Sequence, residues 1–244
     1  LDDFSIGEIV IPPTPPGTLA DYNEVWTSPS SASWESMPLG NGETTLNVWV
    51  EGNGDLLFYI GRSDSESENN RNLKLGRVRV KLTPNPFAAG QPFRQTLDLA
   101  NGSILIHAGA SGAQTRLKIW VDANHPVIRV TGDCDAPLSV EASYEMTLRT
   151  LNTATTINDA HQGDYVLNDG ANAVTWYRRN RGSAFYSNLS VEGLTQSLAN
   201  IQDPLMNRTV GGRISGTGMT RSGTQKLVKS STTSLDLSID VHAG

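Results

Sequence analysis

Residues 235–241 read Leu-Asp-Leu-Ser-Ile-Asp-Val, an unbroken alternation of aliphatic and polar side chains. Successive side chains of a β-strand point to opposite faces, so this stretch predicts a strand with one face buried and one in water. Residues 138–148 also place an apolar side chain at every other position. These two runs predict that antiparallel strands dominate the fold.

Further short apolar runs are separated by turns that contain glycine, at residues 51–55, 101–102 and 168–170. Asn101-Gly102 is the strongest of these signals, because an Asn-Gly pair suits a two-residue hairpin turn. Helix evidence is limited to residues 193–202, where apolar side chains recur every three or four positions before Pro204. The sequence therefore predicts an all-β chain, a large antiparallel β-supersandwich with at most one or two short helices.

Residues 12–17 are mostly proline, which withholds amide donors, so residues 1–20 are expected to form an extended lead-in. Residues 21–244 are expected to form a single β-supersandwich domain, a length that such folds reach as one unit. The chain stops at Gly244, directly after the strand at 235–241, which is more typical of a piece of a larger protein.

Composition excludes several classes of partner and site. The 19 Lys and Arg against 25 Asp and Glu give a formal net charge of −6, which argues against binding to nucleic acid. The longest apolar run, residues 56–60, is too short to cross a membrane. The single cysteine, Cys134, excludes an intramolecular disulfide and a cysteine-based zinc cluster. The four histidines lack the spacing of metal ligands, so we expect neither a metal nor a cofactor.

The acidic segment 64–70, Asp-Ser-Glu-Ser-Glu-Asn-Asn, leaves two interpretations open. Its carboxylate and amide oxygens are ligands that calcium accepts, but the spacing is not that of an EF-hand. A solvated loop is the alternative. No carboxylate pair is singled out by the sequence, and no catalytic residue is assigned.

Two segments have the composition of a glycan-binding surface. Residues 34–43 surround an asparagine with glycines after a tryptophan, and residues 176–180 combine rings with donor groups near a strand end. Aromatic faces stack on sugar rings and polar groups bond hydroxyls, although a plain β-turn and core packing are the alternatives. The predicted carbohydrate contacts, two of them in the segment after residue 60, are Trp34, Asn41, Arg62, Asp64, Trp176 and Tyr177.

Three Asn-x-Ser/Thr acceptors for glycosylation occur, at Asn101, Asn188 and Asn207. They are compatible with a secreted glycoprotein, and extracellular localisation is the expectation. Asn101 is better explained by its hairpin turn.

Several longer motifs, in order along the chain, carry a family resemblance. The sequence resembles the N-terminal β-supersandwich domains of six-hairpin glycosidase-like proteins, related to family 95 glycoside hydrolases of the α-L-fucosidase and α-L-galactosidase type. The resemblance covers roughly residues 21–244. The motifs lie at residues 37–42, 46–49, 54–60, 73–80, 120–126 and 203–209.

This resemblance implies a sandwich that packs against a helical barrel, with the catalytic carboxylates in the barrel and not in this chain. It also implies that the loops at 40–42 and 62–66 lean toward the sugar site. The expected function is a non-catalytic carbohydrate-associated domain of a secreted glycosidase-like protein, with a glycan or polysaccharide and the helical barrel as partners. A free-standing lectin is the alternative, and a self-contained glycoside hydrolase is a third, less favoured reading.

Overall fold

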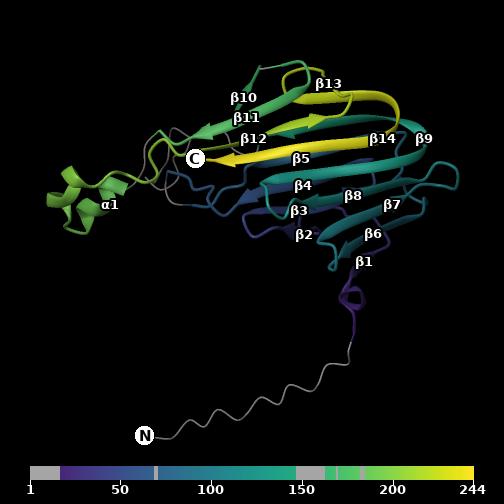
Figure 1. Ribbon diagram of the computed structural model, residues 1–244, viewed down its shortest axis with the longest axis horizontal. Coiled ribbons are helices and arrows are strands. Elements are labelled where there is room, and N and C mark those ends of the chain that lie inside the picture. The colour runs from purple at the N-terminus through teal and green to yellow at the C-terminus, as the bar shows by residue number, and fades with distance from the viewer. Residues whose placement is uncertain (1–16, 69–70, 147–162, 169, 182–184) are drawn as a thin grey trace, which may run out of the picture.

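The computed structural model describes residues 17–68, 71–146, 163–168, 170–181 and 185–244. Within these residues, 14 strands pair in antiparallel ladders to form one large sheet that branches and curls on itself (Figure 1). This arrangement confirms the predicted all-β class and antiparallel pairing.

The sheet branches at two long strands, β9 (Val127–Glu145) and β14 (Lys226–Ala243), which pair with each other along most of their length. The first half of β9 also pairs with β8, whereas its second half pairs with β5. Each half therefore belongs to a different layer. The alternation predicted for residues 235–241 is confirmed, because its four aliphatic side chains are at most 4% exposed.

One layer continues from β9 and β14 in both directions. Its other strands are β1 (Glu24–Trp26), β6 (Phe93–Asp98), β7 (Ser103–Ala108), β8 (Thr115–Val121), β12 (Thr209–Gly216), β11 (Ala173–Arg179) and β10 (Tyr165–Leu167). The other layer is shorter. Its strands are β2 (Met37–Gly40), β3 (Thr44–Glu51), β4 (Asp55–Arg62), β5 (Gly76–Thr83) and β13 (Thr220–Arg221).

The inward side chains of both layers form one continuous apolar core. An aromatic pair joins the layers, since Tyr144 and Trp176 stack with ring centroids 4.2 Å apart. The indole Nε1 of Trp176 donates to the carbonyl oxygen of Leu75 at 2.7 Å, so the polar atom of this buried ring is satisfied.

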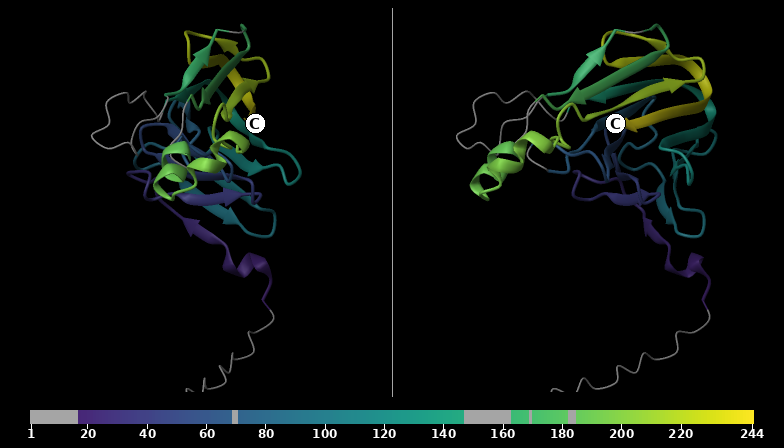
Figure 2. Two further views of the ribbon diagram at one scale, coloured as in Figure 1. Left: turned by 90° about the vertical axis from the view of Figure 1, so that its left-hand side faces the viewer. Right: turned by 60° about the vertical axis from the view of Figure 1, so that its left-hand side comes forward.

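Among the described residues, helical structure is confined to short pieces: η1 (Leu19–Tyr22), α1 (Phe185–Val191) and η3 (Thr195–Asn200). The helix predicted over 193–202 is present only as the 3₁₀ segment η3, because Gly193, with φ of 76°, ends the preceding helix α1. α1 and η3 contact each other and project from the sandwich, as Figure 1 and the right-hand view of Figure 2 show. No helix in the described part of the chain is long and apolar enough to cross a membrane.

The predicted lead-in and domain boundary are only partly described. Residues 1–16 of the lead-in lie outside the described residues, and η1 overlaps the expected boundary at residue 20. The first strand of the sheet begins at Glu24.

Candidate functional site

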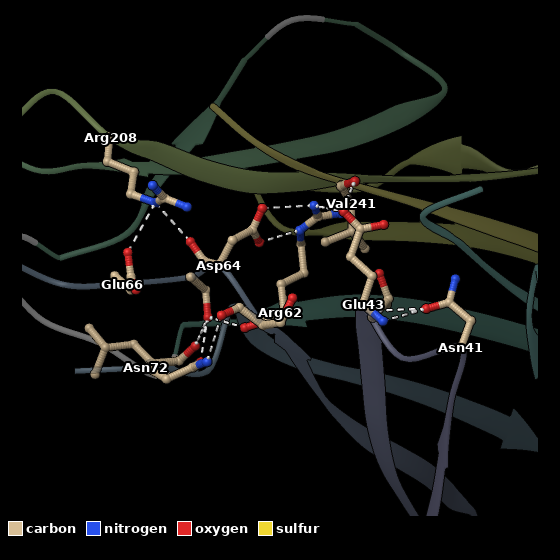
Figure 3. Close-up of polar contacts among 12 residues, drawn as sticks. Asn41, Glu43, Arg62, Asp64, Glu66, Asn72, Arg208 and Val241 are labelled. Carbon is tan, nitrogen blue, oxygen red and sulfur yellow. Dashed lines mark hydrogen bonds and ion pairs between the residues drawn. The ribbon is translucent and has the colours of Figure 1, made fainter. Parts of the chain in front are cut away.

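Arg62, the last residue of β4, joins one layer of the sandwich to the other (Figure 3). Its side chain is only 5% exposed and makes a two-pronged contact with Asp64, at 2.8 Å from Nε and 3.0 Å from Nη2. The guanidinium also pairs with Glu43, and Nη1 donates to the carbonyl oxygen of Val241 at 3.5 Å. We call Arg62, Asp64 and Glu43 the Arg62 clamp, because they hold the end of β14 against β4.

The electrostatics of the clamp follow from this geometry. Hydrogen bonds from Arg62 hold the pKa of the Asp64 carboxyl below its ordinary value, against the opposing effect of burial. The same bonds raise the pKa of the Arg62 guanidinium. Both groups are therefore charged over the physiological pH range and neutralise each other.

A second arginine ties the loop after β4 to the start of β12. Arg208 donates from Nε to the carbonyl oxygen of Asp64 at 2.9 Å and lies 3.7 Å from the carboxylate of Glu66. The side-chain amide of Asn180 donates to the carbonyl oxygen of Glu66 at 3.0 Å. The loop is thus fixed to β11 and β12, the strands that carry the hollow described next.

A hollow of about 660 Å³ lies over the outer face of β11, β12 and β14, next to the chain segments that the clamp holds. Its volume is within the range of about 300–1,000 Å³ usual for ligand pockets. The described residues that line it are Thr175, Trp176, Tyr177, Arg179, Asn207, Thr209, Val210, Gly211, Gly212, Arg213, Asp240, His242, Ala243 and Gly244.

A row of three paired residues crosses this hollow. Tyr177 on β11 is opposite Gly211 on β12, which is opposite His242 on β14. Neighbouring strands are about 4.8 Å apart, so the backbones of Tyr177 and His242 are about 10 Å apart with no side chain between them. Tyr165 extends the row, its ring stacked on Tyr177 at a centroid distance of 5.5 Å.

Glycine is required at the centre of the row. A Cβ added at Gly211 would lie 2.8 Å from the Cα of Tyr177 and closer still to the carbonyl oxygen of Trp176. No larger residue fits without moving β11. The floor of the hollow is therefore bare backbone, flanked by a phenol ring and an imidazole ring.

Two of the predicted carbohydrate contacts, Arg62 and Asp64, are engaged with each other, and a third serves a turn nearby. Asn41 donates from Nδ2 to the carbonyl oxygen of Asp122 at 2.8 Å, and its Oδ1 accepts from the backbone N–H of Thr44 at 2.8 Å. Gly42 follows with φ of 95°, in agreement with the alternative of a turn that needs a positive φ. These three side chains have structural partners where they stand.

The aromatic predictions fall in three different environments. Trp34 is 84% exposed, and no hydrogen bond or ring contact joins it to another described residue. Trp176 is 1% exposed in the core and offers no ring face to a ligand in this structure. Its neighbour Tyr177 points the other way and lines the hollow. The structure therefore brings Tyr177 to the candidate site but leaves Trp34 apart from it.

An additional arginine, Arg178, lies on the inner face of β11, the same face as Trp176. It is 2% exposed, and burial lowers the pKa of its guanidinium, opposed by the charges of Asp164 and Glu68. Arg178 thus belongs to the interior and not to the hollow.

The glycosylation candidates are exposed residues with different settings. Asn101 occupies the β6–β7 hairpin turn, as its alternative interpretation expected, and Asn188 lies in α1. Asn207 is on the rim of the hollow, where its Oδ1 accepts from Nη2 of Arg179 at 2.9 Å.

Sequence reasoning missed Gly211, Arg213 and His242 as candidates. The glycines of β12 interrupt the alternation that would have marked it as a strand, and His242 has no partner within its own segment. The pairing of three strands distant in sequence creates the site.

No group of three or more potential metal-ligating side chains occurs among the described residues. In the segment 64–70, the carboxylate of Asp64 is bound by Arg62, and residues 69–70 lie outside the described part. The calcium alternative for this segment stays a prediction.

Comparison with known families gives a match over residues 25–239, almost the entire sandwich. This chain belongs to the family DUF5703_N. That family is described as a domain of unknown function, DUF5703. A search of the curated proteins gives no match. Membership in DUF5703_N is thus shown, while the resemblance to family 95 glycoside hydrolases remains an expectation from the sequence.

Proposed function

We propose that this DUF5703_N chain is a non-catalytic, carbohydrate-associated β-sandwich domain and that a glycan binds in the hollow over β11, β12 and β14. The observation that carries the proposal is the row of Tyr177, Gly211 and His242, in which two rings flank a bare floor. The chair of a pyranose ring presents apolar C–H groups on its faces, and such a slot accommodates it between aromatic side chains.

The rim of the hollow supplies the groups that sugar hydroxyls need. Thr209 carries a hydroxyl, and Asn207 carries an amide at one end. Small-molecule sites usually combine an apolar surface with a small number of polar groups that point toward the ligand.

The small number of acidic side chains at the site favours binding without hydrolysis. Most glycoside hydrolases use two carboxylates on either side of the scissile bond. Asp240 is the one acidic side chain among the described residues that line the hollow. Glu43 and Asp64 nearby are both engaged in ion pairs with Arg62.

The experiment is a glycan-array screen of the purified chain, followed by titration of the best-bound glycan against Tyr177→Ala. We expect affinity to fall about tenfold or more, because loss of ring stacking and apolar contact amounts to about 1.4 kcal/mol. Tyr22→Ala is the matched control, since Tyr22 is 58% exposed and lies in η1, outside the hollow.

Two results contradict the proposal. Absence of binding to every glycan on the array contradicts glycan binding altogether. Loss of binding in Trp34→Ala with full binding in Tyr177→Ala moves the site to the loop at 34–42.

The second candidate function is the accessory role within a larger glycosidase-like protein, with a helical barrel as partner. The observation that favours it is the projecting α1–η3 segment, where Val191 is 89% exposed and Tyr186 and Leu194 about 40% exposed (39% and 41%). Apolar side chains gathered on such a projection are typical of a surface that another domain covers. Amide hydrogen exchange tests this: residues 185–196 should be protected in the protein isolated from its source and unprotected in the 244-residue chain. Equal exchange in both contradicts it.

A further inference from the structure

The hollow carries positive charge on a protein whose formal net charge is −6. Arg179 and Arg213 line it from β11 and β12, and His242 lines it from β14. A third arginine stands beside this surface, with the guanidinium of Arg181 5.8 Å from the ring centroid of Tyr165. Asp240 is the single acidic side chain among the described lining residues, so the surface is locally basic.

The arginines that line the hollow form no ion pair with a described carboxylate, whereas six other arginines do. Arg179 bonds to the neutral amide of Asn207, and no hydrogen bond or ion pair joins the side chain of Arg213 to any other described residue. Asp240 is the cross-strand partner of Arg213, yet the two side chains form no ion pair. By contrast, ion pairs to carboxylates are made by Arg62, Arg77, Arg79, Arg116, Arg129 and Arg208.

These two guanidinium groups, neither of which is ion-paired with a described carboxylate, stand on either side of the ring slot. Arg179 is two residues beyond Tyr177 along β11, and Arg213 is two residues beyond Gly211 along β12, in the opposite direction. Two residues of a strand span about 6.8 Å, so each arginine is anchored within side-chain reach of a ring seated over Gly211. An anionic substituent on either end of that ring would meet a guanidinium.

We propose that the ligand of the hollow is an acidic glycan, in which a hexuronate ring lies between Tyr177 and His242 and its carboxylate is bound by Arg213. This inference rests on the proposed function and names its ligand class. The planar guanidinium binds a carboxylate through two parallel hydrogen bonds, which is stronger and more directional than a bond to a neutral hydroxyl.

The test is isothermal titration of the chain with a galacturonate trisaccharide and with the same trisaccharide methyl-esterified on its carboxylates. The two probes share ring shape and linkage and differ in charge. We expect the free acid to bind at least tenfold more tightly, with an affinity that falls as salt rises from 50 to 500 mM on the order of several-fold. The methyl ester should show little dependence on salt.

Variants assign the preference to named residues. Arg213→Gln should remove most of the preference for the free acid and leave the affinity for the methyl ester unchanged. Arg94→Gln is the matched control, because Arg94 is an exposed arginine of β6, outside the hollow and without an ion-pair partner among the described residues. It should behave as wild type with both probes.

The outcomes distinguish failure of the acidic-ligand inference from failure of the proposed glycan binding. Equal affinity for free acid and ester, or an unchanged preference in Arg213→Gln, overturns the acidic ligand but leaves glycan binding intact. Binding of sulfated galactose oligosaccharides without binding of the galacturonate also overturns the hexuronate. Absence of binding to every glycan tested removes both the inference and the proposed function.

Discussion

Replacement of Arg62 by methionine should destabilise the sandwich while sparing the hollow's chemistry. The variant keeps a long unbranched side chain but removes the two bonds to Asp64, the pair with Glu43 and the bond to the carbonyl oxygen of Val241. Removal of one partner of a buried ion pair costs about 3–5 kcal/mol.

The expected cost here is smaller than that range. Glu43 is 51% exposed and Asp64 32% exposed, so water rehydrates both carboxylates once Arg62 is gone. We therefore expect the free energy of unfolding to fall by about 2–3 kcal/mol. For a domain of this length that corresponds to a fall in melting temperature of about 4–12 °C.

Urea unfolding and calorimetry of wild type and Arg62→Met measure the effect. Arg129→Met is the control, since Arg129 forms an ion pair with Asp236 at 2.8 Å in which both side chains are about one-third or more exposed (35% and 44%). Such a surface pair contributes about 0–1 kcal/mol. A loss at Arg62 no larger than at Arg129, together with a large loss of glycan affinity, would refute the clamp and restore Arg62 as a ligand contact.

Three further outcomes follow from the geometry. Asp64→Asn should destabilise at neutral pH, and the difference from wild type should shrink as pH falls below 3.8, because the folded-state pKa of Asp64 lies below that ordinary value and protonation removes the charge; a difference that is the same at pH 7 and at pH 2 in urea titrations would contradict this. Trp176→Ala should cost about 3–5 kcal/mol in chemical unfolding, as expected for a fully buried ring, and a cost under about 1 kcal/mol would place that ring outside the core. Trp34→Ala should change stability by less than about 0.5 kcal/mol and leave glycan affinity at the wild-type level, whereas a tenfold loss of affinity would reveal a contact outside the hollow.

The local elements of the fold were predictable because they depend on residues that are neighbours in the sequence. The alternation at 235–241 fixed which face of β14 is buried, and Asn101-Gly102 placed the β6–β7 turn. The branching of the sheet was not predictable, because it depends on β9 pairing with different strands along its two halves.

The site was predictable only in part. Residues 173–179 alternate, but Arg178 has the same parity as Trp176, so the pattern does not show that this parity is the buried one. Contact of Arg62 with Val241, 179 positions away in sequence, likewise leaves no local signal. The bare floor at Gly211 becomes visible only when β12 is placed between β11 and β14.

Mapping of amide chemical shifts during titration with the best-bound glycan tests the central claim most directly. The account predicts that the largest shifts fall on Gly211 and on its cross-strand neighbours Tyr177 and His242, with the loop at 34–42 unchanged. Shifts centred on residues 34–42 or on the Arg62 clamp, with Gly211 unmoved, would contradict it.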